Sequence, residues 1–178
     1  KRFLFSVVDQ KQFIHDCISK VKASKTGTII QVGSNDGISN DPLRPFIETT
    51  KSPVYLIEPL PFLTKKLADL YKDSQNVKIL EIAIHPENEM ATFYSLSREA
   101  AARMGDNWKP WYNQLGSFSK DHLIKHSSQI QPYIQELEMK CSTLDKVVSN
   151  EEISEIMILH VDAEGFDLDV LRSISIDT

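Results

Sequence analysis

The sequence is short of the features that mark several functional classes. Its 178 residues include only two cysteines, Cys17 and Cys141, in no C-x-x-C pair, so neither a zinc motif nor a disulfide framework is indicated. The lysines and arginines are scattered and the formal net charge is −5, which gives no basic face for nucleic acid. No apolar run approaches the ~18 residues of a membrane span. We therefore expect no nucleic-acid partner and no membrane segment in this chain.

What remains is the composition of a globular domain. Hydrophobic residues make up 41% and charged residues 25% of the chain, and the length suits a single core. Both cysteines lie in apolar patterns typical of core thiols, which fits a reducing compartment and predicts a cytoplasmic location. The chain starts at Lys1 without a methionine, so an upstream leader or anchor stays open as an alternative.

The first half of the sequence alternates strands with helices. A helical stripe of apolar residues runs over 9–23. Three buried strands are predicted over 28–32, 54–57 and 77–84, with a helix over about 62–71 between the last two. This order is typical of a parallel sheet that is covered by helices on both faces.

The second half has a different texture. Residues 90–96 alternate and predict an antiparallel addition, whereas 98–134 contain two tryptophans and show no clear period. A further strand is predicted over 137–141. A buried strand over 156–161, followed by a helix over about 168–174, closes the chain.

The predicted fold class is therefore α/β, with a Rossmann-like and mostly parallel sheet in a single domain over 1–178. An open doubly wound sheet usually has more strands than this. We expect either that the domain continues past Thr178 or that a partner covers the exposed edge of the sheet. A homo-oligomer stays open.

Small or polar residues follow four of the predicted strands. In a parallel sheet, ligands bind outside the carboxyl ends of the strands, so these four ends are expected to meet at one site. They are Gly33-Ser34-Asn35-Asp36-Gly37, Glu58-Pro59, Ile82-Ala83-Ile84-His85 and Asp162-Ala163-Glu164-Gly165.

The first of these ends could hold a ligand against bare backbone, or it could be a tight bend. Gly33 and Gly37 can adopt backbone angles that other residues resist. A dinucleotide fingerprint G-x-G-x-x-G would need a glycine where Asn35 stands, and no Walker sequence G-x-x-x-x-G-K-[ST] occurs. The turn is therefore a poor cradle for a pyrophosphate, although its N–H groups could meet a carboxylate.

The next two ends suit a nucleoside. Glu58 stands about twenty positions after the glycine turn, where an acidic residue accepts hydrogen bonds from ribose hydroxyls; the alternative is a helix-capping acid before Pro59. Ile82 and Ala83 offer either an apolar surface for adenine or simply a buried strand end. An adenosine without a pyrophosphate points to S-adenosylmethionine.

The amino-acid end of that cofactor needs carboxylates and backbone donors. Asp36 or Asp162 could meet its ammonium group or the neighbouring sulfonium, while N–H groups of the glycine turn could meet its carboxylate.

The sequence resembles the FkbM-type S-adenosylmethionine-dependent methyltransferases in four segments, IIQVGSNDG, VYLIEP, ILEIAI and ILHVDAEGFDLDVL. The last is the most specific, because a strand ending in Asp-x-Glu-Gly, then an acidic residue and an apolar helix, looks like the family's hallmark. The resemblance covers about residues 27–174 and implies a class I methyltransferase fold and O-methylation, often of sugar or polyketide hydroxyls. It places Gly33 to Gly37 and Glu58 around the cofactor, and Asp162 and Glu164 where cofactor and acceptor meet.

On this interpretation the single domain has four parts. Residues 1–26 are a helical lead-in and 27–84 the cofactor-binding half. Residues 85–154 are a variable crossover that serves as lid or acceptor region, and 155–178 are the last strand–helix unit.

Methyl transfer to a hydroxyl needs a base, and a carboxylate or histidine beside the cofactor is the natural candidate. We predict Asp162 or Glu164. His160 lies inside an apolar strand, so we expect a core histidine with its hydrogen bonds satisfied, and we expect His85 to lie outside the site. The two carboxylates could instead hold Mg²⁺, but no third ligand is evident in the sequence, so no metal is predicted.

The long crossover is expected to contact a small-molecule or sugar acceptor, because such folds place lids and acceptor pockets there. The alternative is a small satellite core under a loop. The residues predicted to contact the acceptor are Trp108, Trp111, Gln114 and Ser117.

Two other functions stay open. A non-catalytic module could keep the fold and bind a protein partner, which the short sheet and the aromatic segment would suit. A nucleotide-dependent oxidoreductase, using NAD, is disfavoured by the absent glycine fingerprint.

Overall fold

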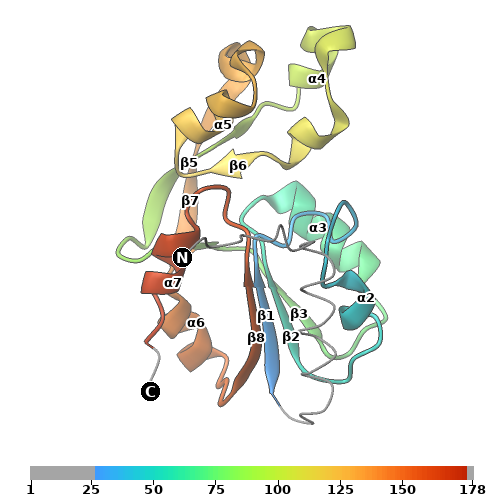
Figure 1. Ribbon diagram of the computed structural model, residues 1–178, viewed down its shortest axis with the longest axis vertical. Helices are drawn as coiled ribbons and strands as arrows, with labels where there is room; N and C mark the ends of the chain where they lie inside the picture. The colour runs from blue at the N-terminus through green and yellow to red at the C-terminus, as the bar shows by residue number, and fades with distance from the viewer. Residues whose placement is uncertain (1–26, 176–178) are drawn as a thin grey trace, which may run out of the picture.

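A four-stranded parallel sheet forms the base of the molecule (Figure 1). The computed structural model describes residues 27–175, so the helix expected over 9–23, with Cys17, lies outside the described residues. The strands stand in the order β3-β2-β1-β8, and every pair is parallel. Their bounds are β1 (Thr28–Val32), β2 (Val54–Ile57), β3 (Val77–Leu80) and β8 (Ile156–Val161). By order of appearance this is 3-2-1-4, the order of a doubly wound sheet.

Helices cover both faces of this sheet, as the apolar pattern predicts. Side chains alternate between faces along a strand, so Ile29 of β1 packs against α2 and α3 on one side. Ile30 packs against α6 and α7 on the other. The helices are α2 (Arg44–Ile47), α3 (Pro61–Leu70), α6 (Leu144–Asn150) and α7 (Asp167–Arg172). The α/β fold class with a mostly parallel sheet is therefore confirmed.

The strand predicted over 77–84 is wrong in extent, because the chain leaves the parallel sheet after Leu80. The carboxylate of Glu81 accepts a hydrogen bond from the Thr64 hydroxyl of α3, and neither Glu81 nor Ile82 is in a strand. Strand β4 (Ala83–Ile84) then pairs in parallel with a different strand, β7 (Ile134–Ser142). One polar side chain in an apolar run thus marks where the chain passes to a second sheet.

The second sheet has the order β4-β7-β5-β6. All of it except β4 belongs to a separate layer, residues 85–142, which we call the upper unit (Figure 1). Strand β5 (Met90–Leu96) pairs antiparallel with β7 along its whole length and with β6 (Gly116–Ser117). The antiparallel addition predicted over 90–96 is therefore confirmed. The strand predicted over 137–141 is also confirmed, within the longer β7.

Short helices fill the rest of the upper unit, and they explain why residues 98–134 show no period. Two are α-helices, and three are 3₁₀-helices, whose repeat of three residues breaks the 3.6-residue pattern. Among the described residues, no helix is long and apolar enough to cross a membrane. The elements are α4 (Ala100–Met104), η1 (Gly105–Asn107), η2 (Pro110–Gln114), α5 (Lys120–His126) and η3 (Ser128–Tyr133).

Hydrogen bonds tie the upper unit to the carboxyl edge of the parallel sheet. Nε2 of Gln114 donates to Oδ2 of Asp36 at 3.1 Å. The Ser117 hydroxyl donates to the backbone carbonyl of Glu164 at 2.8 Å. The loops that follow β1 and β8 are thus held against the upper unit.

Strand β8 stands at one edge of the parallel sheet within the described part of the chain. All six of its residues are only partly buried, whereas all five of the central strand β1 are buried. Leu168 and Leu171 of the adjacent helix α7 are exposed. The expectation that further chain or a partner covers this edge stays a prediction.

Candidate functional site

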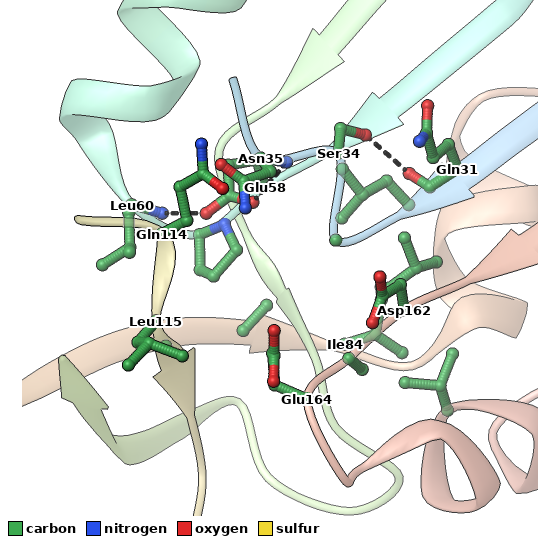
Figure 2. Close-up of a pocket in the computed structure, with 18 of the residues that line it drawn as sticks. Gln31, Ser34, Asn35, Glu58, Leu60, Ile84, Gln114, Leu115, Asp162 and Glu164 are labelled. Carbon is green, nitrogen blue, oxygen red and sulfur yellow. Dashed lines mark hydrogen bonds between the residues drawn. The ribbon is translucent and has the colours of Figure 1, made fainter. Parts of the chain in front are cut away.

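A cavity of about 310 Å³ lies between the carboxyl ends of the parallel strands and the upper unit. Figure 2 shows Glu58 beside Asn35 on one side of it, and Asp162 and Glu164 on another. All four predicted strand ends contribute to its wall. The residues of the predicted cofactor site that line it are Gly33, Ser34, Asn35, Glu58, Pro59, Ile82, Ala83 and Asp162.

Gly33 is required where β1 and β8 end side by side. Its φ of 76° lies in the left-handed region, and a Cβ built on it would stand 1.9 Å from the carbonyl oxygen of Asp162. Only a glycine lets the two strand ends approach this closely. The glycine therefore brings the turn after β1 and the acidic loop after β8 to one place.

The structure corrects the prediction for the other end of the glycine turn. Asp36 and Gly37 are not among the residues that line the cavity. A Cβ on Gly37 would come within 2.8–3.4 Å of Leu67, Leu70 and Tyr71, so this glycine lets the turn pack against α3. The turn thus partly lines the cavity and is partly a tight bend.

Asp36 holds the turn together instead of facing the cavity. Its carboxylate accepts hydrogen bonds from the N–H groups of Ile38 and Ser39, from the Ser39 hydroxyl and from Gln114. Burial alone would raise the pKa of Asp36, but the hydrogen bonds from Ser39 and Ile38 outweigh it and lower the pKa. A side chain so fully engaged is poorly placed to meet an ammonium group.

Glu58 is a buried carboxylate at the end of β2. One oxygen accepts from the N–H of Asn35 at 2.9 Å and the other from the N–H of Leu60 at 3.1 Å. Burial raises the pKa of Glu58 to about 7, although the two N–H donors oppose the rise. A carboxylate has about four acceptor positions, so two remain for hydroxyl groups of a ligand. The capping bond to Leu60 and the predicted ligand role are therefore compatible.

The loop after β8 presents two further carboxylates to the cavity. Burial raises the pKa of Asp162, and the nearby carboxylates of Glu164 and Asp167 raise it further. Asp167 closes the loop by accepting a hydrogen bond from the N–H of Ala163 at 2.8 Å. Glu164 has a φ of 47°, a left-handed conformation that is strained for a residue with a side chain.

Such strain gathers at this cavity. Among the described non-glycine residues, Asn35, Asn40, Glu152 and Glu164 have a positive φ, and all but Glu152 line the cavity. Strained backbone of this kind is held in place by its surroundings and clusters at functional sites.

The prediction of a satisfied core histidine at position 160 is wrong. His160 lines the cavity, and its Nδ1 atom is buried without a hydrogen-bond partner. Gln31, its partner in register on β1, also lines the cavity and has a buried, unpaired Oε1 atom. Two buried polar atoms without partners on neighbouring strands are costly, and a polar ligand in the cavity would satisfy them.

His85 is not among the residues that line the cavity, as expected. Its ring packs against Phe118 and Phe166, and its Nδ1 accepts from the N–H groups of Glu87 and Asn88.

Only two of the four residues predicted to contact the acceptor line the cavity. Trp111 and Gln114 line the cavity, whereas Trp108 and Ser117 are not among the lining residues. Trp108 packs into the hydrophobic cluster of the upper unit, with its ring 5.5 Å from that of Tyr112. Ser117 is buried, and its hydroxyl donates a hydrogen bond to the backbone carbonyl of Glu164. The satellite core that the sequence left as an alternative thus exists beside the cavity.

Sequence reasoning missed two histidines, His122 and His126, that lie next to Glu164. Their Nε2 atoms stand 3.1 Å and 3.5 Å from Oε2 of Glu164. The signal was present as two histidines four residues apart in DHLIKH, which share one face of a helix. This spacing did not lead to a prediction, because the surrounding sequence has no clear helical period and no helix was expected there.

Comparison with known proteins places the chain in a family. A family model described as the methyltransferase FkbM domain matches residues 31–178, which include every segment that lines the cavity. The chain belongs to this family. The FkbM resemblance of the sequence is thereby confirmed, and the cavity described above is the candidate active site of a methyltransferase FkbM domain.

Other comparisons add little to this assignment. No protein of curated function matches the chain. Among solved structures, the 23S rRNA methyltransferase ErmE is similar at 15% sequence identity and a TM-score of 0.31, over 55% of this chain. The matched part spans 50% of that protein's chain.

Proposed function

We propose that this FkbM domain transfers a methyl group from S-adenosylmethionine to a hydroxyl group of a small molecule or sugar. The observation that carries the proposal is Glu58, a buried carboxylate at the end of β2 with acceptor positions left free beside the glycine turn. At this place in a doubly wound sheet an acidic residue binds the two ribose hydroxyls of an adenosine ligand.

The rest of the donor side fits the same cofactor. Ile82 and Ala83 give the cavity an apolar wall that suits adenine. The unpaired Oε1 of Gln31 can accept from an ammonium group. The prediction that N–H groups of the glycine turn bind the cofactor's carboxylate is wrong for this structure, because the N–H groups of residues 33–37 already donate within the chain. The cavity volume of about 310 Å³ lies at the lower end of the range for small-molecule sites.

The carboxylates after β8 suit the proton transfer that O-methylation requires. The cofactor supplies an activated methyl group, so the protein has to align the acceptor and remove its hydroxyl proton. Asp162 and Glu164 both line the cavity. The raised pKa of Asp162 makes it a stronger base when ionised, which favours it as the group that accepts the proton.

The upper unit supplies the surface for the acceptor. Trp111 and Gln114 line the cavity from η2, opposite the parallel sheet. An aromatic face beside an amide suits a sugar or another hydroxyl-bearing ring, because the ring stacks on apolar C–H groups while the amide binds hydroxyls.

Calorimetric titration with S-adenosylmethionine and S-adenosylhomocysteine tests the donor half of this proposal, with NADH as a control ligand. The first two should bind and NADH should not. Glu58→Ala should weaken binding about tenfold or more, because hydrogen bonds to a charged group contribute about 1.5–3 kcal/mol.

Glu138→Ala is the matched control. Glu138 is a glutamate of β7 whose carboxylate bonds Thr92 on the surface of the upper unit, so binding should stay unchanged. Equal affinity of the Glu58→Ala protein and the unaltered protein would remove the ribose role. Absence of binding by the unaltered chain would refute the proposal and leave a non-catalytic module.

A further inference from the structure

Two histidines of α5 face one carboxylate of the loop after β8. The potential ligand atoms of His122, His126 and Glu164 all lie within 4.8 Å of one another. They come from the upper unit and from the parallel sheet, so the cluster exists only in the folded chain. We propose that these three side chains bind a divalent transition metal ion of the zinc type.

The distances are compatible with a metal ion that the three side chains share. Zinc binds imidazole nitrogen and carboxylate oxygen at about 2.0–2.1 Å in a tetrahedral arrangement, which sets neighbouring ligand atoms about 3.4 Å apart. The two histidine Nε2 atoms lie 3.1 Å and 3.5 Å from the same Oε2 of Glu164. An ion pair would need one histidine, whereas here a single oxygen faces two.

Helix α5 holds both rings on one face. Positions four apart on a helix lie above one another, and the ring centroids of His122 and His126 are 5.2 Å apart. Between them Leu123 is completely buried in the core of the upper unit, and the Ser119 hydroxyl accepts from the N–H of His122 at the start of the helix. The helix is therefore anchored without use of the two imidazole rings.

The backbone on the other side is shaped to admit these rings. Gly165 has a φ of 88°, and a Cβ on it would stand 2.5 Å from Nδ1 of His122. Any other residue there would displace the ring. The carbonyl of Glu164 is held by the Ser117 hydroxyl at 2.8 Å, which fixes the loop that carries the third ligand.

The cluster is accessible and it adjoins the cavity. The side chains of His122, His126 and Glu164 are 27%, 33% and 32% exposed, so an ion can reach them from solvent. His126 and Glu164 also line the cavity. Because three protein ligands leave at least one position of a zinc ion open, a ligand in the cavity can occupy that position.

The ligand set selects the class of metal. Two imidazoles with one carboxylate suit zinc, cobalt, nickel or iron(II), whereas magnesium and calcium prefer oxygen ligands alone. The site therefore differs in kind from the Asp162–Glu164 magnesium pair that the sequence suggested as an alternative.

The role of the ion rests on the proposed function, although its binding does not. In a methyltransferase, an ion here would hold the hydroxyl oxygen of the acceptor beside Asp162. A hydroxyl bound to a metal ion loses its proton more readily, which is the property that methyl transfer to oxygen requires.

The test is calorimetric titration of the full chain, freed of metal by a chelator, with Zn²⁺. We expect one ion to bind, and Co²⁺ in its place to give the visible absorption spectrum of nitrogen and oxygen coordination. Losing even an outer partner of a ligand costs about 10–100-fold in affinity, so His126→Ala and Glu164→Gln should each cost about a hundredfold or more. His85→Gln alters a histidine away from the cluster and should change nothing.

Circular dichroism of each variant establishes that it is folded. Zinc binding that both substitutions abolish supports the site. An absence of zinc binding, or equal affinity in His126→Ala, Glu164→Gln and the unaltered chain, overturns it. S-adenosylhomocysteine is titrated into the same samples. Zinc binding without binding of that ligand leaves the metal site standing and refutes only the proposed methyl transfer.

Discussion

The parallel sheet and the upper unit meet at one cavity, but they are built in different ways. The sheet is made of regular strands and helices whose buried faces follow simple periods. The upper unit combines a three-stranded antiparallel sheet with short helices, three of them 3₁₀. The sheet contributes the glycine turn and the carboxylates to the cavity, and the upper unit contributes Trp111, Gln114 and His126.

On the proposed function, this difference separates the two tasks of the site, which are binding of the methyl donor and binding of the acceptor. The donor side rests on backbone geometry at the ends of buried strands, which few substitutions can preserve. The acceptor side rests on side chains of short elements around a small core. The donor side should therefore tolerate little change, whereas the acceptor side can be altered locally.

The largest expected effect is that of Gly33→Ala in the parallel sheet. The new Cβ would meet the Asp162 carbonyl at 1.9 Å, and the left-handed backbone adds strain of about 1–2 kcal/mol. We expect the free energy of unfolding in urea to fall by about 3 kcal/mol or more. Gly105→Ala is the control in the upper unit, because its φ of 53° is also positive but nothing lies within 4 Å of the new Cβ. It should cost only the backbone strain, about 1–3 kcal/mol, and therefore less than Gly33→Ala.

Equal losses for the two glycine variants would show that backbone strain, and not the close approach of β1 and β8, accounts for Gly33. The distinction between a rigid donor side and an adaptable acceptor side would then lose its main support.

The two tryptophans of the upper unit should respond differently to alanine. Trp108 packs in the hydrophobic cluster, so its removal should lower the free energy of unfolding by about 2–4 kcal/mol. Trp111 is 41% exposed and should cost about 1 kcal/mol or less, yet it should reduce turnover of any acceptor found by screening. Unfolding in urea and methyl-transfer assays on both variants measure these effects. A larger loss of stability for Trp111→Ala than for Trp108→Ala would show that Trp111 has a structural role, and would contradict the prediction that it contacts the acceptor.

The smallest expected effect is a pH dependence that arises from Glu58. Its pKa is about 7 in the folded chain against 4.5 for the ordinary group, so its contribution to stability is present below pH 4.5 and is lost as the pH rises through 7. Between pH 6 and 8 this removes about 1 kcal/mol from the free energy of unfolding. The ribose hydroxyls need an ionised acceptor, so S-adenosylhomocysteine should bind about tenfold more tightly at pH 8 than at pH 6.

Unfolding and calorimetry at both pH values, repeated on Glu58→Gln, check this pair of opposite trends. The glutamine does not titrate, so both trends should flatten. If the Glu58→Gln protein shows pH trends of the same size in stability and in ligand affinity, a titratable group other than Glu58 causes them.

The parallel sheet was predictable from the sequence because burial on both faces leaves continuous apolar runs, as in β1 and β2. The departure of the chain after Leu80 was not, because a two-residue strand such as β4 looks like a continuation of the preceding one. The elements of residues 98–134 could not be placed, because 3₁₀ turns have no apolar period long enough to detect.

The candidate site was predictable where a strand end fixes the position of a residue. Gly33, Glu58 and Asp162 were found in this way, and all three line the cavity. The hydrogen bond between Asp36 and Gln114 and the packing of Trp108 against the hydrophobic cluster depend on neighbours distant in sequence. The pairing of α5 with Glu164 depends on contacts between the two layers, which periodicity does not report.

The two ends of the upper unit lie side by side. Ile84 and Ser142 are partners in register, and the N–H of His85 donates to the carbonyl of Ser142 at 2.9 Å. Adjacent ends of this kind are what an inserted segment requires, because such a segment can change in length without changing the path of the chain beneath it. Grafting residues 85–142 from one FkbM domain onto the parallel sheet of another should therefore carry the acceptor preference with it.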